Sequence, residues 1–196
     1  MSQQTTLLTS HKGVDLHAAT ALRVMQERLD GGGFLKGLFR CEMHTFSVGE
    51  HGLTMERLLA AGRYYNPNKH HFGHFAGTIA PELFTSPEIV EDRALPPEWP
   101  GLIQDTDLEV PHQELYDTLL GGMAPPDCCA VDLASFPLGQ EGPLVSGVLW
   151  RLVLQTDPSK AAELGERLAV ACGRKQGLLI NPHMEAWLTA VRQEIR

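Results

Sequence analysis

Apolar and polar residues alternate from Leu35 onward, as in a strand with two different faces. One face is apolar and carries Gly37, Phe39, Cys41 and Met43. The other is polar and carries Lys36, Arg40, Glu42 and His44, with Leu38 as the exception. Successive side chains of a strand point to opposite faces, and antiparallel sheets commonly have one solvated face. The pattern therefore predicts an antiparallel strand with a buried face and a wet face.

The segments around this strand have their own signals. A strand is predicted over residues 5–11. Asp15 is a suitable N-cap for the helix that follows, in which apolar residues recur at helical spacing, and Gly31–Gly33 end this helix. Downstream, Thr54 can cap a short helix that runs to about Arg63. A short edge strand is predicted next, at Tyr64 and Tyr65.

The second half of the chain repeats this order. We predict a helix over 113–120, strands over 128–136 and 144–155, and a helix that begins at Asp157-Pro158, a capping residue followed by proline at the first helical position. The segment 144–155 is apolar on nearly both faces. It should therefore lie centrally, between the two halves.

The two halves also share sequence. Gly37 and Gly147 begin the corresponding strands, and Glu-Arg-Leu occurs in both following helices at 56–58 and 166–168, so both offsets are 110 residues. Asn66-Pro67 and Asn181-Pro182 follow at an offset of 115. Such self-similarity indicates a duplication. We predict an α+β fold of tandem ferredoxin-like (split β-α-β) units with antiparallel sheets, at residues 1–76 and 111–196.

Charge separates these units from the segment between them. The net charge is −8, and residues 76–143 contain 13 acidic residues against one basic residue, Arg93. We therefore interpret residues 77–110 as an acidic, proline-rich connector. The chain has no clustered stripe of Lys and Arg residues, and so its sequence does not predict nucleic-acid binding. The sequence has no apolar run long enough to predict a membrane span, and no signal peptide is evident. Its four cysteines lack the spacing of a disulfide framework, which favours a cytoplasmic protein.

Two segments resemble the PurS-type small subunit of phosphoribosylformylglycinamidine synthase. They are Lys-Gly-Val-Asp at 12–15, before the first helix, and Leu-Leu-Ile-Asn-Pro-His-Met-Glu-Ala-Trp at 178–187, after the last. The resemblance implies a non-catalytic subunit that forms homo-oligomers through its sheets. It also implies partners, the large synthetase subunit and the glutaminase subunit of purine biosynthesis. The family unit is about half as long as this chain, and the Asn66-Pro67 copy departs from the family pattern after proline.

The least regular segment, residues 63–75, is the predicted ligand-binding site. Arg and Lys side chains suit anionic oxygens, and tyrosine rings can stack on a base. The candidates are Arg63, Tyr64, Tyr65, Asn66, Asn68, Lys69 and His70. The alternative is a polar hairpin in which the tyrosines are core residues and the asparagines shape a turn.

Histidines raise a second possibility, a transition-metal site. The candidate ligands are His44, His70, His71 and His74. Against this, Gly73 disfavours the helix that would bring His70 and His74 to one face, and no recognised metal motif is present. The sequence implies no cofactor, and it contains no nucleophile elbow, phosphate-binding loop or dinucleotide fingerprint.

Three functions remain open. The first is a scaffold or interaction protein without catalytic activity in isolation. The second is a sensor or carrier of an anionic, phosphorylated metabolite. The third is a metal-dependent enzyme based on histidine.

Overall fold

The strands of both halves join into one antiparallel sheet. The computed structural model describes residues 3–48, 54–76, 101–104, 108, 110–140 and 144–192. These residues form a seven-stranded sheet with the order β4-β3-β1-β2-β6-β5-β7, in which all neighbours are antiparallel. The elements are β1 (Gln3–His11), α1 (Leu16–Arg28), a 3-10 turn (Gly32–Phe34), β2 (Leu35–Val48), α2 (Met55–Ala60), β3 (His70–Ala76), β4 (Gly101–Gln104), α3 (His112–Leu119), β5 (Cys129–Pro137), β6 (Leu144–Leu154), α4 (Pro158–Ala169) and β7 (Glu185–Arg192).

Local signals start α1 and α4 as predicted. The Asp15 side chain accepts hydrogen bonds from the backbone N–H groups of His17 and Ala18, and Asp157 caps α4 in the same way through Ser159. Gly31 has a φ of 87°, a left-handed conformation that glycine adopts without steric cost. These caps satisfy backbone donors that a helix cannot pair internally.

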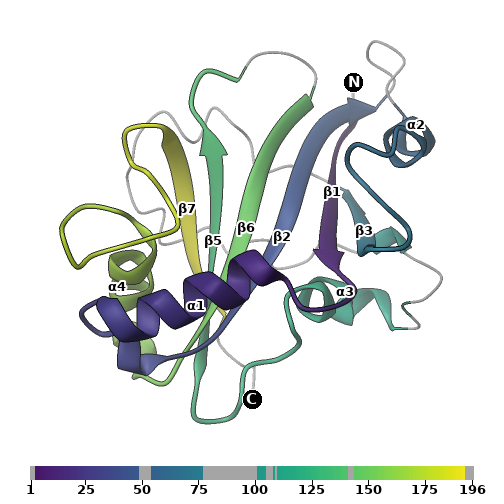
Figure 1. The fold of residues 1–196 in the computed structure, drawn as a ribbon. Coiled ribbons are helices and arrows are strands. Elements are labelled where there is room, and N and C mark those ends of the chain that lie inside the picture. Colours follow the sequence, from purple (N-terminus) through teal and green to yellow (C-terminus); the bar gives the residue numbers. More distant parts are fainter. Residues whose placement is uncertain are drawn as a thin grey trace.

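Helices cover both faces of the sheet (Figure 1). On one face, α1 lies across the strands and packs with α4 over an apolar cluster around Leu38 and Leu152. On the opposite face, α3 packs over a cluster around Cys41, Met43 and Leu149. A third cluster lies under α2.

The α+β class and the antiparallel sheet are confirmed, and so is the central position of the strand at 144–155, because β6 pairs with both β2 and β5. Two tandem ferredoxin-like units are not confirmed. Each half does contain one β-α-β crossover: β2 and β3 are both antiparallel to β1, and β6 and β7 are both antiparallel to β5. However, β1 and β2 are adjacent, and each half contributes only part of a ferredoxin-like sheet.

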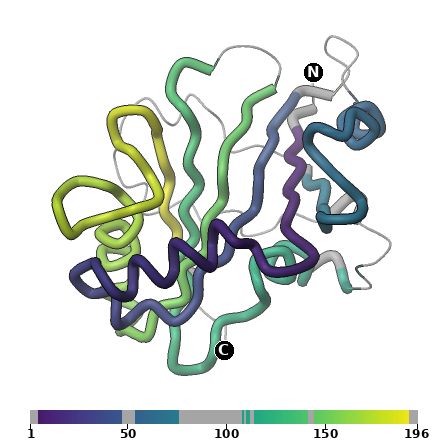
Figure 2. The backbone as a smooth tube through the Cα atoms, in the orientation of Figure 1, coloured from purple at the N-terminus to yellow at the C-terminus, as the bar shows by residue number. Residues whose placement is uncertain are grey.

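The two halves meet at residues that occupy equivalent positions in the two copies of the repeat. Arg40 pairs with Trp150 across β2 and β6, and these residues are 110 apart, which is the offset of the repeat. The path of the backbone shows β1, β2, α2 and β3 on one side of this pair and β5, β6, α4 and β7 on the other (Figure 2). The connector at 77–110 lies largely outside the described residues, apart from β4, Leu108 and Val110.

Three local predictions are wrong. His44 is 7% exposed, and so the polar face of β2 is not wet at this end, because the segment around α2 packs over it. Tyr64 and Tyr65 lie in a loop, and the return strand starts later, at His70. The predicted helix is also shorter, since α2 ends at Ala60.

Candidate functional site

The predicted ligand loop is shaped by Asn66. Its carbonyl oxygen accepts hydrogen bonds from the backbone N–H groups of Lys69 (2.9 Å) and His70 (2.8 Å), and its Oδ1 accepts one from Asn68 N–H (3.0 Å). The Asn66 N–H donates to His70 Nδ1 at 3.3 Å. Asn66, Asn68 and His70 therefore build a turn, which matches the alternative interpretation of this segment.

The second Asn-Pro segment forms the same turn. The Asn181 carbonyl accepts from Met184 N–H and Glu185 N–H, both at 2.9 Å, and Asn181 Oδ1 accepts from His183 N–H at 3.1 Å. The Asn181 N–H donates to Glu185 Oε2 at 2.8 Å, so Glu185 takes the place of His70. Each turn leads into the return strand of its crossover.

The aromatic residues of the loop pack against the sheet. The Tyr64 ring lies edge-on to His44 with centroids 4.7 Å apart, and Tyr65 contacts Phe72 in the same manner at 4.9 Å. The Arg63 guanidinium lies 5.5 Å from the Tyr64 ring centre. Arg63 and Lys69 are exposed, whereas the two rings are half-buried against the cluster under α2.

The four candidate metal ligands do not converge. His70 and His74 are on one face of β3 and His71 is on the other, because side chains alternate along a strand. His44 and His74 lie on either side of Leu7, which pairs with both. Among the described residues, no group of three or more His, Cys, Asp or Glu side chains is placed to hold a metal ion.

Two of these histidines are buried on the sheet. His44 Nδ1 is 2.9 Å from Ser146 Oγ, and burial lowers the pKa of His44 to about 4. Burial also lowers the pKa of His74, and neither of its ring nitrogens has a hydrogen-bond partner among the described residues. Both side chains are therefore held as neutral imidazoles at pH 7.

A cavity of about 470 Å³ lies along the edge of β2, and sequence reasoning missed it. Five consecutive residues of β2, 36 to 40, line it. Since alternate side chains point to opposite faces, a cavity that touches all five must run along the edge of the strand. We call this cavity the β2 slot.

The slot exists because β1 separates from β2. Pairing between them ends at Thr9 and Glu42, whereas β2 begins seven residues before Glu42 and pairs there with β6. Ser10 and His11 pair with β3 only and line the end of the slot. The other edge of β2 over residues 36–40 therefore faces the slot with no strand beside it in the described part of the chain.

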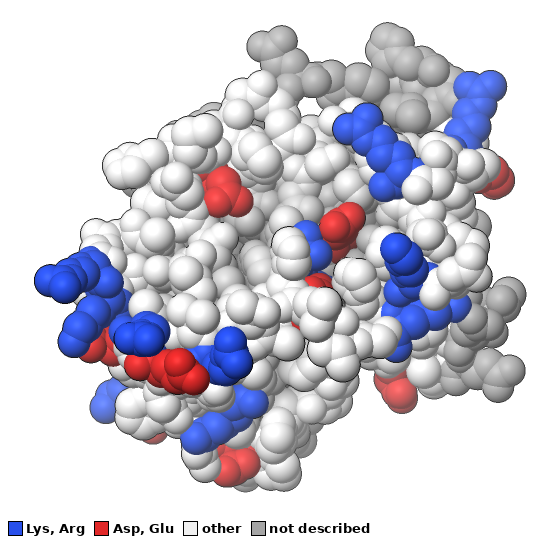
Figure 3. All heavy atoms as spheres, in the orientation of Figure 1, with Lys and Arg blue, Asp and Glu red and all other residues white. Residues whose placement is uncertain are grey.

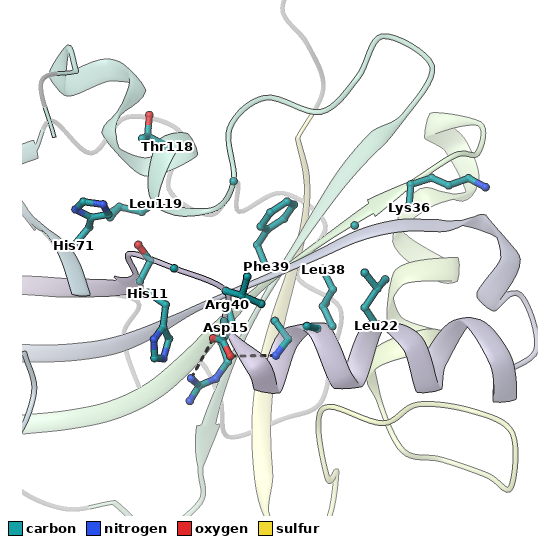
Figure 4. A pocket seen from close by; sticks show the side chains of 17 residues that line it. His11, Asp15, Leu22, Lys36, Leu38, Phe39, Arg40, His71, Thr118 and Leu119 are labelled. Atoms are coloured by element: carbon teal, nitrogen blue, oxygen red, sulfur yellow. Dashed lines mark hydrogen bonds and ion pairs between the residues drawn. The ribbon is translucent and has the colours of Figure 1, made fainter. Parts of the chain in front are cut away.

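Helices form the two walls of the slot (Figure 4). Leu38 points toward α1, where Ala18, Ala19 and Leu22 line one wall, and Phe39 points the other way. The second wall comes from the end of α3, with Thr118, Leu119 and Gly121. Gly121 has a φ of 84°, and a Cβ there would overlap the Phe39 ring, so this wall requires glycine.

Charged groups lie at both ends of the slot's β2 edge. The Arg40 guanidinium is 3.2 Å from Glu42 Oε1 and 3.6 Å from Asp15 Oδ2, and it lies over the Trp150 ring. At the other end, the exposed Lys36 donates to the carbonyl of Gly33 at 3.0 Å. Arg40 is therefore matched by two carboxylates, and among the described residues that line the slot Lys36 is the cation available to a ligand. On the face drawn in Figure 3, Lys and Arg occur in separate groups with Asp or Glu nearby, and form no continuous stripe.

A buried ionic network was also missed. Arg151, 1% exposed, donates from Nε and Nη2 to both carboxylate oxygens of Asp132 at 2.7 and 2.8 Å, and from Nη1 to Asp117 at 2.8 Å. The Tyr116 hydroxyl donates to Asp132 Oδ2 at 2.9 Å. Burial alone would lower the pKa of Arg151, but the hydrogen bonds and charge of Asp132 outweigh it and raise that pKa. This network attaches α3 to the sheet.

The sequence contained partial signals for both missed features. The expected strand at 5–11 is shorter than the expected strand that starts at Leu35, and this difference in length is consistent with an unpaired edge. Arg151 interrupts an otherwise apolar strand, and buried arginine requires an acidic partner. Which carboxylate it meets depends on the register of β5 against β6.

Comparison with family models, curated proteins and solved structures gave no match to this chain. None of the helices in the described ranges combines the length and hydrophobicity needed to cross a membrane.

Proposed function

We propose that this chain is a non-catalytic interaction protein and that the β2 slot is its binding site. One observation carries the proposal: five consecutive residues of a central strand line a cavity of about 470 Å³, between helices that hold it open on both faces. Ligand pockets are commonly concave and largely apolar, with a few polar groups that orient the ligand. Leu22, Leu38 and Leu119 supply the apolar wall, and Lys36 supplies a cation.

A substitution that fills the slot tests this function. Ala19 is exposed on α1 and lines the slot, whereas the neighbouring Thr20 is also exposed but does not line it. Ala19→Trp should therefore obstruct the slot, and Thr20→Trp is the control that places the same side chain on α1 outside it. Ala19→Ser is a second control, because serine and tryptophan have similar helix propensities but serine adds little bulk. The probes are a small-metabolite library and an mRNA-displayed library of random heptapeptides, each selected against the wild-type chain.

The expected result is a set of ligands that bind Ala19→Trp at least tenfold more weakly than wild type and bind both controls with nearly unchanged affinity. If neither library yields a ligand with this difference, the slot is not the binding site. Equal loss in Ala19→Trp and Thr20→Trp would also count against it, because it would reflect damage to α1.

A PurS-like scaffold is a second candidate, and it is favoured by how the halves join. The resemblance implies subunits that associate through their sheets, and here two related halves share one sheet across β2 and β6. Co-expression with the large synthetase and glutaminase subunits, followed by size-exclusion with light scattering, tests this role. A defined complex would support it, and a strict monomer with no bound subunit would reject it.

A further inference from the structure

The β2 slot has the shape of a missing strand. Strand residues rise about 3.3 Å each, so the edge over residues 36–40 is about 17 Å long. β1 occupies the neighbouring position up to Thr9 and then moves away. An occupant of the slot would lie beside β2 in line with β1, at the usual spacing of neighbouring strands.

The edge of a strand presents N–H and C=O groups at every second residue. Such a row is best satisfied by another extended backbone, which is the basis of peptide recognition by strand addition. No backbone–backbone hydrogen bond from a described loop reaches residues 36–40 at this edge. A compact molecule would satisfy only part of the row.

We propose that the β2 slot binds an extended peptide segment of a protein partner, which adds a strand beside Lys36–Arg40. This inference rests on the proposed function, since it names the class of ligand for the same slot. The partner segment would form backbone hydrogen bonds with β2 and place its side chains alternately toward α1 and α3.

The walls specify which side chains the peptide carries. Toward α1 the slot offers Ala18, Leu22 and Leu38, and toward α3 it offers Phe39 and Leu119, so apolar residues suit the centre of the peptide on both sides.

The charged residues at the two ends of the slot determine which residues suit the ends of the peptide. Arg40 already contacts Asp15 and Glu42, and so it has little capacity for another carboxylate. Lys36 is exposed and donates to a backbone carbonyl, so an acidic residue should lie at this end of the peptide. The segment is therefore extended, apolar at its centre and acidic at the Lys36 end.

Backbone methylation of the bound peptide tests strand addition directly. The probe is the tightest heptapeptide selected from the mRNA-displayed library whose binding is lost in Ala19→Trp and kept in Thr20→Trp. N-methylation removes one backbone donor at a time. We expect at least a tenfold loss of affinity by calorimetry at alternate residues and little change at the residues between them, together with cross-strand NOEs between the peptide and residues 36–40.

Lys36→Glu tests the charge preference independently. Its side chain is exposed, so the variant should fold, and peptides selected against it should carry a basic residue in place of the acidic one. A slot ligand that tolerates methylation at every position would overturn strand addition while leaving the proposed function intact. If no library member is sensitive to Ala19→Trp, both proposals fail.

Discussion

Arg151 shows how one residue can hold an element in place. Its charge is almost fully removed from water, and it is compensated by Asp132 and Asp117, with Tyr116 completing the hydrogen bonds of Asp132. Breaking such a pair leaves a buried charge without a partner, which is more costly than the net value of the pair. The network is therefore a sensitive point of the fold.

Arg151→Met should lower the free energy of unfolding by about 3–5 kcal/mol, because Asp132 would remain buried without its cation. Urea denaturation monitored by circular dichroism measures this value. Arg167→Met, at an exposed position of α4, is the control and should change stability by about 0.5 kcal/mol or less. A loss below about 1 kcal/mol for Arg151→Met would show that the network is not critical.

His44 should make stability depend on pH. Its pKa is lowered to about 4 in the folded chain from an ordinary value of 6.5. Between these values the unfolded chain binds a proton that the folded chain does not, so stability falls as pH falls below 6.5. At about 1.4 kcal/mol per pKa unit, the loss from pH 7 to pH 5 should be about 2 kcal/mol.

Urea denaturation at pH 7 and pH 5 measures this loss, and His44→Leu should reduce it because the titrating group is gone. NMR titration of the His44 ring gives a direct check. A midpoint near 6.5 in the folded protein would contradict a buried, neutral His44 imidazole.

At the scale of elements, the two β-α-β crossovers share the same Asn-Pro turn but differ in a side chain that takes part in it. Asn66 and Asn181 make corresponding hydrogen bonds before β3 and β7, although their i+4 partners are His70 and Glu185. The duplication seen in the sequence is thus preserved where the backbone needs a particular geometry. The side chain at the i+4 position differs, and in each copy it accepts a hydrogen bond from the backbone N–H of the asparagine.

Asn66→Ala and Asn181→Ala should each lower stability by about 0.5–1.5 kcal/mol, because each removes the side-chain acceptor of its turn. Asn68→Ala is the control, since Asn68 contributes its backbone N–H rather than its side chain to the turn. Chemical denaturation of the three variants compares them. If Asn68→Ala costs as much as Asn66→Ala, the shared turn is not the cause.

At the scale of the whole molecule, β2 and β6 make the two halves one body. Leu149 is 1% exposed and pairs with Cys41 across this junction, in the cluster that α3 covers. A change here removes contacts from both halves at once. The structure therefore predicts one cooperative unfolding unit.

Leu149→Ala should cost about 2–5 kcal/mol and should lower hydrogen-exchange protection in β1 and β5 together. Leu138→Ala, at a position 55% exposed, is the control and should change neither. Loss of protection in β5 with none in β1 would show that the halves unfold independently.

The patterns in the chain determined much of the local structure. Alternation predicted β2, a nearly continuous apolar segment predicted β6, capping residues predicted the starts of α1, α2 and α4, and the repeat predicted equivalent Asn-Pro turns. These features depend on neighbouring residues, whose geometry follows from backbone sterics and local hydrogen bonds. The sequence also marked residues 63–75 as its least regular segment.

Long-range packing decided the rest. The edge strand expected at Tyr64 and Tyr65 was wrong because both rings pack on the cluster under α2, and His44 is buried by the same contacts. The β2 slot and the partners of Arg151 depend on where β1 leaves β2 and on the register of β5 against β6. Register and helix docking join residues far apart in sequence, and so no local pattern contains them.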